Sequence, residues 1–301
     1  MKDIVRYHAA LFILIELFLY KKMGKIEQYC MEERKKAEIE YYDTQAALQS
    51  ADRGRDFEGF SPSVLGSYRF LYKVAAPLCE GKKVLDYGCG NGVHTAFLAE
   101  HAAEVVGIDL SERSLAVARE RRESWMFHQV DDRQRSGTRG KAEFLKMDCE
   151  ALEFPNGSFD VVFDGGTFSS LDFQKAIAEI TRVLRPDGIL VGIETFGHNP
   201  FANAKRVLNR VTGKRTAWAA SHIVRQKELT LLKQHFGGCE VFYFHLVSLF
   251  AFPFVNLPGG RFVLELAEQI DKMLLHFSFL QKYAFKVVFV CKNPKHDKKD
   301  I

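Results

Sequence analysis

Short apolar runs alternate with segments of helical periodicity through the middle of this 301-residue chain. The runs are KVLDYG (83–88), EVVGIDL (104–110), EFLKMD (143–148), FDVVFDGG (159–166) and GILVGIET (188–195). Helical patterns lie between them at 93–102, 112–123 and 172–184, and another precedes them at 64–79. Strands that alternate with helices usually pair in parallel and are covered on both faces. Together with apolar runs at 239–247 and 284–292, the pattern predicts an α/β, Rossmann-like doubly wound sheet of seven strands.

The pattern of the first sixty residues predicts a helical arm. Residues 26–50 are charged, rich in helix formers and free of proline and glycine, which favours a helix. The run AALFILIELFLY (9–20) has basic flanks and is shorter than the ~20 residues that span a bilayer. No small-residue cleavage site of a signal peptide follows it. We interpret 9–20 as an amphipathic or buried helix that packs on the protein or lies in the plane of a membrane.

A second apolar addition lies between the last two predicted strands, where this fold usually has a short connection. Residues 248–283 are dense in Phe, Leu and Val, and their second half places apolar residues largely on one helical face. Three partners could cover this surface: helix 9–20, a lipophilic acceptor or a membrane.

The chain is therefore divided into four parts. They are an N-terminal helical arm or lid (1–60), a cofactor-binding core (61–195), an acceptor-side cap and helix (196–238), and the last two strands with their apolar helical insertion (239–301, with the insertion at 248–283). The polar segment 127–141 is expected to be an exposed loop.

Composition excludes several classes of protein. The 42 basic and 38 acidic residues leave a net charge of +4, too balanced to indicate nucleic-acid binding. Six scattered cysteines show no C-x-x-C pair, so we expect reduced thiols, a cytoplasmic protein and no metal site.

The stretch VLDYGCGNG (84–92) indicates a ligand that approaches the backbone closely, because three glycines follow the first predicted strand. A dinucleotide site would need G-x-G-x-x-G, but Val93 occupies the third glycine position. Asp86 precedes the glycines and would suit a cationic ligand better than a pyrophosphate. Asp109, at the end of the second run, is placed to accept hydrogen bonds from ribose hydroxyls.

These landmarks resemble those of the class I S-adenosylmethionine-dependent methyltransferases, in their small-molecule (type 11-like) branch. VLDYGCGNG is similar to the first motif, VVGIDLS to the acidic loop, MDCEALEFPNGSFDVVF to the second motif and ITRVLRPDGILV to the third. The resemblance covers about residues 82–195 and implies S-adenosylmethionine as the cofactor. It further implies a set of cofactor contacts. The methionine would be surrounded by Asp86, Gly88, Cys89, Gly90 and Gly92, and its amino-acid end would be met by Asp164 and Gly165. Ribose and adenine would be held by Asp109 and Leu110, adenine also by Asp148 and Cys149, and Tyr42 would form part of a lid.

Methyl transfer to a hydroxyl usually needs a base, and histidine is the side chain best suited to it. His198 follows the fifth predicted strand, and Gly197 gives the backbone freedom to turn it inward, so His198 is the preferred candidate. His222 is a second candidate. We interpret His94 as packing or touching the cofactor.

The resulting expectation is methyl transfer to a small, lipophilic acceptor, with oxygen methylation slightly favoured over carbon methylation of a prenyl, quinone or terpenoid acceptor. A cofactor-binding membrane-peripheral protein without turnover remains an alternative. A nucleic-acid methyltransferase is disfavoured because the fourth run ends in DGG rather than in an Asn/Asp-Pro-Pro-aromatic motif. A location in the cytoplasm at the inner face of a membrane would suit the lipophilic acceptor.

Overall fold

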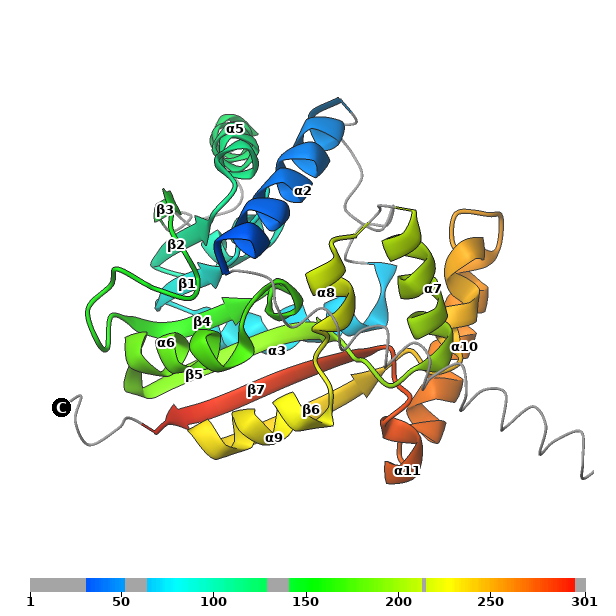
Figure 1. Cartoon of the computed structure of the whole chain (residues 1–301). Coiled ribbons are helices and arrows are strands. Elements are labelled where there is room, and N and C mark those ends of the chain that lie inside the picture. Colours follow the sequence, from blue (N-terminus) through cyan, green and yellow to red (C-terminus); the bar gives the residue numbers. More distant parts are fainter. Residues whose placement is uncertain (1–30, 52–63, 129–140, 213–214, 296–301) are drawn as a thin grey trace, which may run out of the picture.

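The computed structural model describes residues 31–51, 64–128, 141–212 and 215–295 (Figure 1). The predicted helix at 9–20 lies outside the described residues, as does most of the predicted loop at 127–141.

A seven-stranded sheet forms the centre of the molecule, in the order β3-β2-β1-β4-β5-β7-β6. The first five strands along the chain run parallel, and β7 pairs antiparallel with both β5 and β6. The strands are β1 (Lys83–Tyr87), β2 (Glu104–Asp109), β3 (Lys141–Lys146), β4 (Phe159–Asp164), β5 (Leu184–Thr195), β6 (Phe236–Phe244) and β7 (Lys286–Pro294). The predicted doubly wound α/β sheet is thereby confirmed.

Helices cover both faces of the sheet because each has one apolar side. They are α3 (Gly66–Cys79), α4 (Val93–Ala99), α5 (Glu112–His128), α6 (Phe173–Val183) and α9 (Gln226–His235). Helix α6 buries Ile177, Ile180 and Val183 against one face, and the Asp172 side chain caps its N-terminus by accepting from two backbone N–H groups. On the other face α3 buries Leu71 and its neighbours.

The remaining helices gather at one end of the sheet and over its edge (Figure 1). They are α2 (Met31–Ala51), η2 (Phe168–Ser170), α7 (Pro200–Val211), α8 (Ala217–Ser221), η3 (Ser248–Phe254), α10 (Gly260–Leu274) and α11 (Ser278–Gln281). The apolar segment between β6 and β7 is thus largely helical. Within the described ranges, no helix is both long and apolar enough to cross a bilayer.

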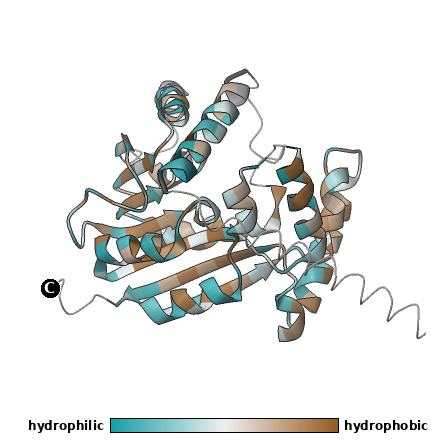
Figure 2. Ribbon diagram, viewed as in Figure 1, coloured by the Kyte–Doolittle hydropathy of each residue, from teal (hydrophilic) through white to brown (hydrophobic). Residues whose placement is uncertain are grey.

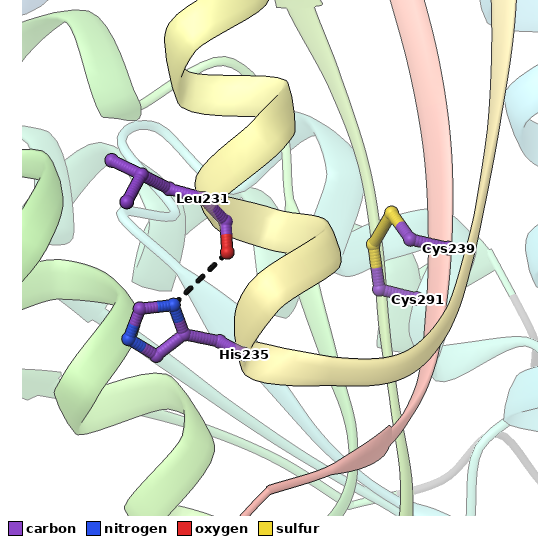
Figure 3. The surroundings of a disulfide bond; sticks show 4 residues. All are labelled: Leu231, His235, Cys239 and Cys291. Atoms are coloured by element: carbon purple, nitrogen blue, oxygen red, sulfur yellow. Dashed lines mark hydrogen bonds between the residues drawn. A yellow bond between two sulfur atoms is a disulfide. The ribbon is translucent and has the colours of Figure 1, made fainter.

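A disulfide between Cys239 and Cys291 joins β6 to β7 (Figure 3). The antiparallel register places these two residues directly opposite each other, which brings their side chains together. The expectation that all cysteines are reduced thiols is therefore wrong for this pair. Cys79, Cys89 and Cys149 are free and buried.

Candidate active site

A cavity of about 910 Å³ opens where the parallel strands end. Its lining includes nine of the residues predicted to bind the cofactor, which come from the turns after four strands and from the arm: Tyr42, Gly88, Cys89, Gly90, Asp109, Leu110, Asp148, Cys149 and Gly165. Five other predicted site residues do not line it: Asp86, Gly92, Asp164, His198 and His222.

The three glycines of the turn after β1 serve different purposes, although all have positive φ (69°, 52° and 73°). A Cβ on Gly88 would lie 2.4 Å from the Thr167 side chain, and one on Gly92 would lie 3.0 Å from Ala118. A Cβ on Gly90 would meet nothing within 4 Å and would extend into open space beside the cavity. Gly88 and Gly92 are therefore needed for packing, whereas Gly90 leaves room for a ligand.

Asp109 fixes the glycine turn to the end of β2. Its carboxylate accepts hydrogen bonds from the backbone N–H of Gly90 (3.0 Å) and of Ser111 (2.8 Å). Burial raises the pKa of this carboxyl above its usual range. Asp109 also lines the cavity, so its carboxylate could accept further hydrogen bonds from a ligand there.

Asp86 lies below the turn rather than at the cavity surface. It is 1% exposed, and the Thr95 hydroxyl donates to its Oδ2 at 2.5 Å. Burial raises its pKa to about 7. Asp86 is not among the residues that line the cavity, so the structure does not support its predicted direct contact with the cofactor.

Replacing Asp86 by asparagine is expected to flatten the dependence of stability on pH. Because the folded-state pKa is raised, the stabilisation associated with the neutral carboxyl is complete below pH ~4 and is lost as pH rises through about 7. Asparagine cannot ionise, so from pH 4 to pH 8 wild type should lose up to about 4 kcal/mol of unfolding free energy relative to the variant. Urea unfolding at several pH values measures this, and Asp187→Asn, at an exposed position of β5, is the matched control. Parallel curves for wild type and Asp86→Asn would contradict the assignment.

Asp164 and Glu194 form a buried acidic pair at the ends of β4 and β5. Asp164 accepts from the backbone N–H of Thr167 (2.9 Å), and Glu194 accepts from that of Phe168 (2.6 Å). Burial, followed by mutual repulsion with Glu194, raises the pKa of Asp164 well above its usual range, and burial raises that of Glu194 to about 7. The pair therefore holds the turn after β4 from below. Asp164 was predicted to contact the cofactor, but it is not among the residues that line the cavity.

The two candidate bases both lie away from the lining. The Gln226 N–H donates to His198 Nε2 at 3.3 Å, and His222 stacks on Trp218 with 3.5 Å between ring centroids. His94 does line the cavity; its Nδ1 is hydrogen-bonded to the Tyr72 hydroxyl, and burial lowers its pKa to about 4. The catalytic roles of His198 and His222 stay predictions.

Helix α2 lies over the end of the cavity that Asp148 lines and is fixed there by charged and polar contacts. Arg34 forms a buried ion pair with Glu150 (2.5 Å), and Lys35 forms one with Asp148. The Tyr42 hydroxyl is 3.2 Å from Ser170 Oγ. Sequence analysis missed these partners because more than 100 residues separate the members of each pair and no local pattern links them.

The far end of the cavity combines apolar and basic side chains. The apolar members include Phe201, Ile223, Leu249, Phe250, Phe252 and Phe285, and the basic members are Lys205, Arg206, Arg215 and Lys286. Phe201 of α7 and Phe250 of η3 pack edge to face, with 4.9 Å between ring centroids. Among the residues with described positions, no three or more His, Cys, Asp or Glu side chains gather as a metal site.

The residues at the near end fit S-adenosylmethionine. Gly90 leaves space for close approach, Asp109 presents a carboxylate, and Leu110 and Cys149 offer apolar contact. The carboxylates at this end suit a cationic sulfonium ligand.

Comparison with known proteins agrees with this geometry. Residues 85–192 match the model of a family described as a methyltransferase domain. The demethylmenaquinone methyltransferase of Thermus thermophilus is 38% identical over 117 residues, which cover 38% of this chain and 47% of that protein. The ubiquinone biosynthesis O-methyltransferase of Pseudomonas aeruginosa is 36% identical over 123 residues, which cover 40% of this chain and 47% of that protein. The chain thus spans about half the length of these curated relatives.

The fold is shared with solved structures at low sequence identity. A chain of a complex that contains the Haloferax volcanii Trm112 methyltransferase activator superposes with a TM-score of 0.50 at 16% identity, covering 86% of this chain and 98% of that one. The predicted family and its cofactor, S-adenosylmethionine, are confirmed by the domain match and the curated relatives together. Residues 85–192 thus form a methyltransferase domain, similar to those of the class I S-adenosylmethionine-dependent methyltransferases.

Proposed function

We propose that the protein transfers a methyl group from S-adenosylmethionine to a small lipophilic acceptor. The observation that carries this proposal is one continuous cavity that runs from the glycine turn after β1 to the apolar side chains of α7 and η3. Its volume of about 910 Å³ lies at the upper end of the usual range for ligand pockets, about 300–1,000 Å³, and supports two ligands side by side.

Bound S-adenosylmethionine supplies an activated methyl carbon, so the chain itself contributes position and exclusion of water. Gly90 and Asp109 would hold the cofactor end, and Tyr42 of α2 would cover it. Phe201 and Phe250 would enclose the acceptor and keep water from the reacting atoms.

An acceptor hydroxyl would also need to lose a proton. We propose His198 as the base for such an acceptor, with His222 as the second candidate; either side chain would have to turn toward the cavity, which neither lines in this structure. The names of the relatives include an O-methyltransferase of ubiquinone biosynthesis, which supports oxygen methylation. Carbon methylation of a prenyl, quinone or terpenoid acceptor is the alternative; it too releases one proton, which leaves the acceptor as the new carbon–carbon bond replaces a carbon–hydrogen bond.

The test is methyl transfer from radiolabelled S-adenosylmethionine to an extract of the host's own cells, followed by partition between organic and aqueous phases. Label in the organic phase is the expected result. Label confined to the aqueous phase would contradict a lipophilic acceptor. No label in either phase would contradict turnover and favour the alternative of a cofactor-binding protein without catalysis.

We further propose that helix α10 rests on a membrane, at its cytoplasmic face. The helix exposes most of its large apolar side chains and buries two carboxylates. Its inner side buries Glu268, which accepts from Arg69, and Asp271, which accepts from three backbone N–H groups. Its outer side exposes Phe262, Val263, Leu266, Ile270 and Met273.

The exposed apolar side chains continue from α10 onto its neighbours, where Figure 2 shows further hydrophobic stretches on α7 and α11. They include Phe201 and Leu208 of α7, Phe250 and Phe254 of η3, and Phe279 of α11. Phe201 and Phe250 also line the cavity, so the apolar face adjoins the proposed acceptor end. An apolar patch of this kind on a protein surface marks a contact with another molecule or a membrane. A bilayer would both cover it and supply a lipophilic acceptor.

Replacing Met273 by glutamate is expected to weaken binding to lipid vesicles about tenfold. Met273 is 73% exposed, so the change should leave the fold intact while it places a charge where the lipid would lie. Gln174→Glu adds the same charge at an exposed position of α6, away from α10, and is the matched control. Vesicle sedimentation measures binding. Equal binding by both variants and wild type would contradict the membrane contact.

A further inference from the structure

Charged side chains line the cavity at both ends. At the near end, Asp148 is paired with Lys35, and Asp109 accepts from backbone N–H groups. Four further basic residues line the same cavity as the apolar side chains: Lys205, Arg206, Arg215 and Lys286. Methyl transfer to an uncharged lipophile does not require such a group of cations, so their presence needs another explanation.

Two of these cations are held in place by neutral groups. Arg206 donates from Nη1 to Asn203 Oδ1 (2.5 Å) and from Nη2 to the Phe196 carbonyl (3.3 Å). Arg215 donates from Nη2 to Ser169 Oγ (3.0 Å) and from Nη1 to the Tyr42 hydroxyl (3.4 Å), and it lies over the Tyr41 ring, 5.7 Å from its centroid. In the described part of the chain, no carboxylate lies within ion-pair distance of either guanidinium.

Both guanidinium groups line the same cavity. Burial, followed by the charges of Arg225 and Arg215, lowers the pKa of Arg206 to about 10, whereas Tyr42 and Glu38 are among the neighbours that raise the pKa of Arg215. Glu38 also lines the cavity, but within the described ranges it forms no ion pair with either arginine. An anion bound between the two arginines would be attracted by both charges and receive fixed N–H donors.

We propose that Arg206 and Arg215 form an anion subsite, and that the acceptor is an amphiphile with an anionic oxyacid group such as a phosphate. Its anionic group binds the two guanidinium groups, and its apolar part lies against Phe201, Phe250 and Ile223, which line the same cavity. This inference rests on the proposed function, since it specifies the class of acceptor.

The test compares probes that share one tail and differ only in the head group. Decyl phosphate and decanol are titrated into the full-length protein saturated with S-adenosylhomocysteine, and binding is followed by calorimetry. Inorganic phosphate is titrated as a third probe. The variants are Arg206→Gln and Arg215→Gln, and the matched control is Arg210→Gln on the same helix as Arg206, whose side chain does not line the cavity.

Wild type should bind decyl phosphate at least about tenfold more tightly than decanol, because hydrogen bonds to charged groups are strong. This preference should shrink about tenfold in Arg206→Gln and in Arg215→Gln and persist in Arg210→Gln. Equal affinity of wild type for decyl phosphate and decanol would overturn the subsite, as would an unchanged preference in both variants. Equal affinity for inorganic and decyl phosphate would overturn the amphiphilic acceptor.

Binding of S-adenosylhomocysteine separates this inference from the proposed function. Arg206→Gln should bind S-adenosylhomocysteine as wild type does, which also shows that the variant is folded. If wild type fails to bind S-adenosylhomocysteine, the proposed function fails. If it binds and shows no preference for the anionic head group, the subsite alone fails.

Discussion

Replacing Gly90 by arginine is expected to reduce the affinity for S-adenosylmethionine more than a hundredfold. The backbone at Gly90 has a φ of 52°, and a Cβ would project into open space beside the cavity. An arginine side chain would fill that space with bulk and positive charge, both of which oppose a sulfonium ligand. Isothermal titration with S-adenosylmethionine measures the loss.

Gly81→Arg is the matched control for this variant. Gly81 also has positive φ (66°) and no atom within 4 Å of a Cβ, but it lies in the exposed turn before β1 and does not line the cavity. Both variants should show the same backbone strain, on the order of 1–2 kcal/mol. A loss of affinity of equal size in both would mean that Gly90 acts through stability, and would contradict its place at the ligand.

Replacing Glu150 by leucine is expected to destabilise the protein by about 3–5 kcal/mol. Its partner Arg34 is 2% exposed, so the change leaves a buried charge without its counter-charge. The change also removes the acceptor of the Asp172 backbone N–H (2.6 Å). Because α2 is fixed over the site by this pair, cofactor affinity should fall as well. Chemical denaturation with parallel titration of the cofactor measures both effects.

An exposed ion pair provides the comparison. Glu112 and Arg119 on α5 are separated by 2.6 Å, but their side chains are 55% and 38% exposed. Glu112→Leu should cost less than about 1 kcal/mol. The double variant Arg34→Met/Glu150→Leu should recover much of the stability lost in Glu150→Leu, because no unpaired charge remains buried. Similar small losses at both sites would contradict the anchoring of α2 by the Arg34–Glu150 pair.

The central sheet could be predicted from sequence because its signals are local. Each parallel strand is a short apolar run, and the glycines after β1 and the acidic ends of β2 and β3 follow at fixed distances. The same signals identified the lining of the near end of the cavity, including Gly90, Asp109 and Asp148.

The contacts of the arm and the cap could not be predicted in this way. The Arg34–Glu150 pair joins residues 116 positions apart, and the Cys239–Cys291 bond depends on the register of two antiparallel strands. A helical pattern was expected within 248–283. Which side of α10 faces inward is determined by the partners of Glu268 and Asp271, and these lie elsewhere in the chain.

Asp86 and Asp164 illustrate a second limit of prediction from the sequence. Both have the right type and spacing for a ligand contact, but both are fully buried and hold the turns beneath the cavity instead. A carboxylate at the end of a strand can accept hydrogen bonds from the backbone as well as from a ligand, and the sequence alone does not distinguish these two roles.

The most direct test of the central claim is a comparison of S-adenosylmethionine with NAD⁺ as ligands of the purified protein, by isothermal titration. The glycine turn, with Val93 in place of the third glycine of a dinucleotide site, predicts saturable binding of one S-adenosylmethionine per chain and no binding of NAD⁺. Binding of NAD⁺, or failure to bind S-adenosylmethionine, would contradict the account.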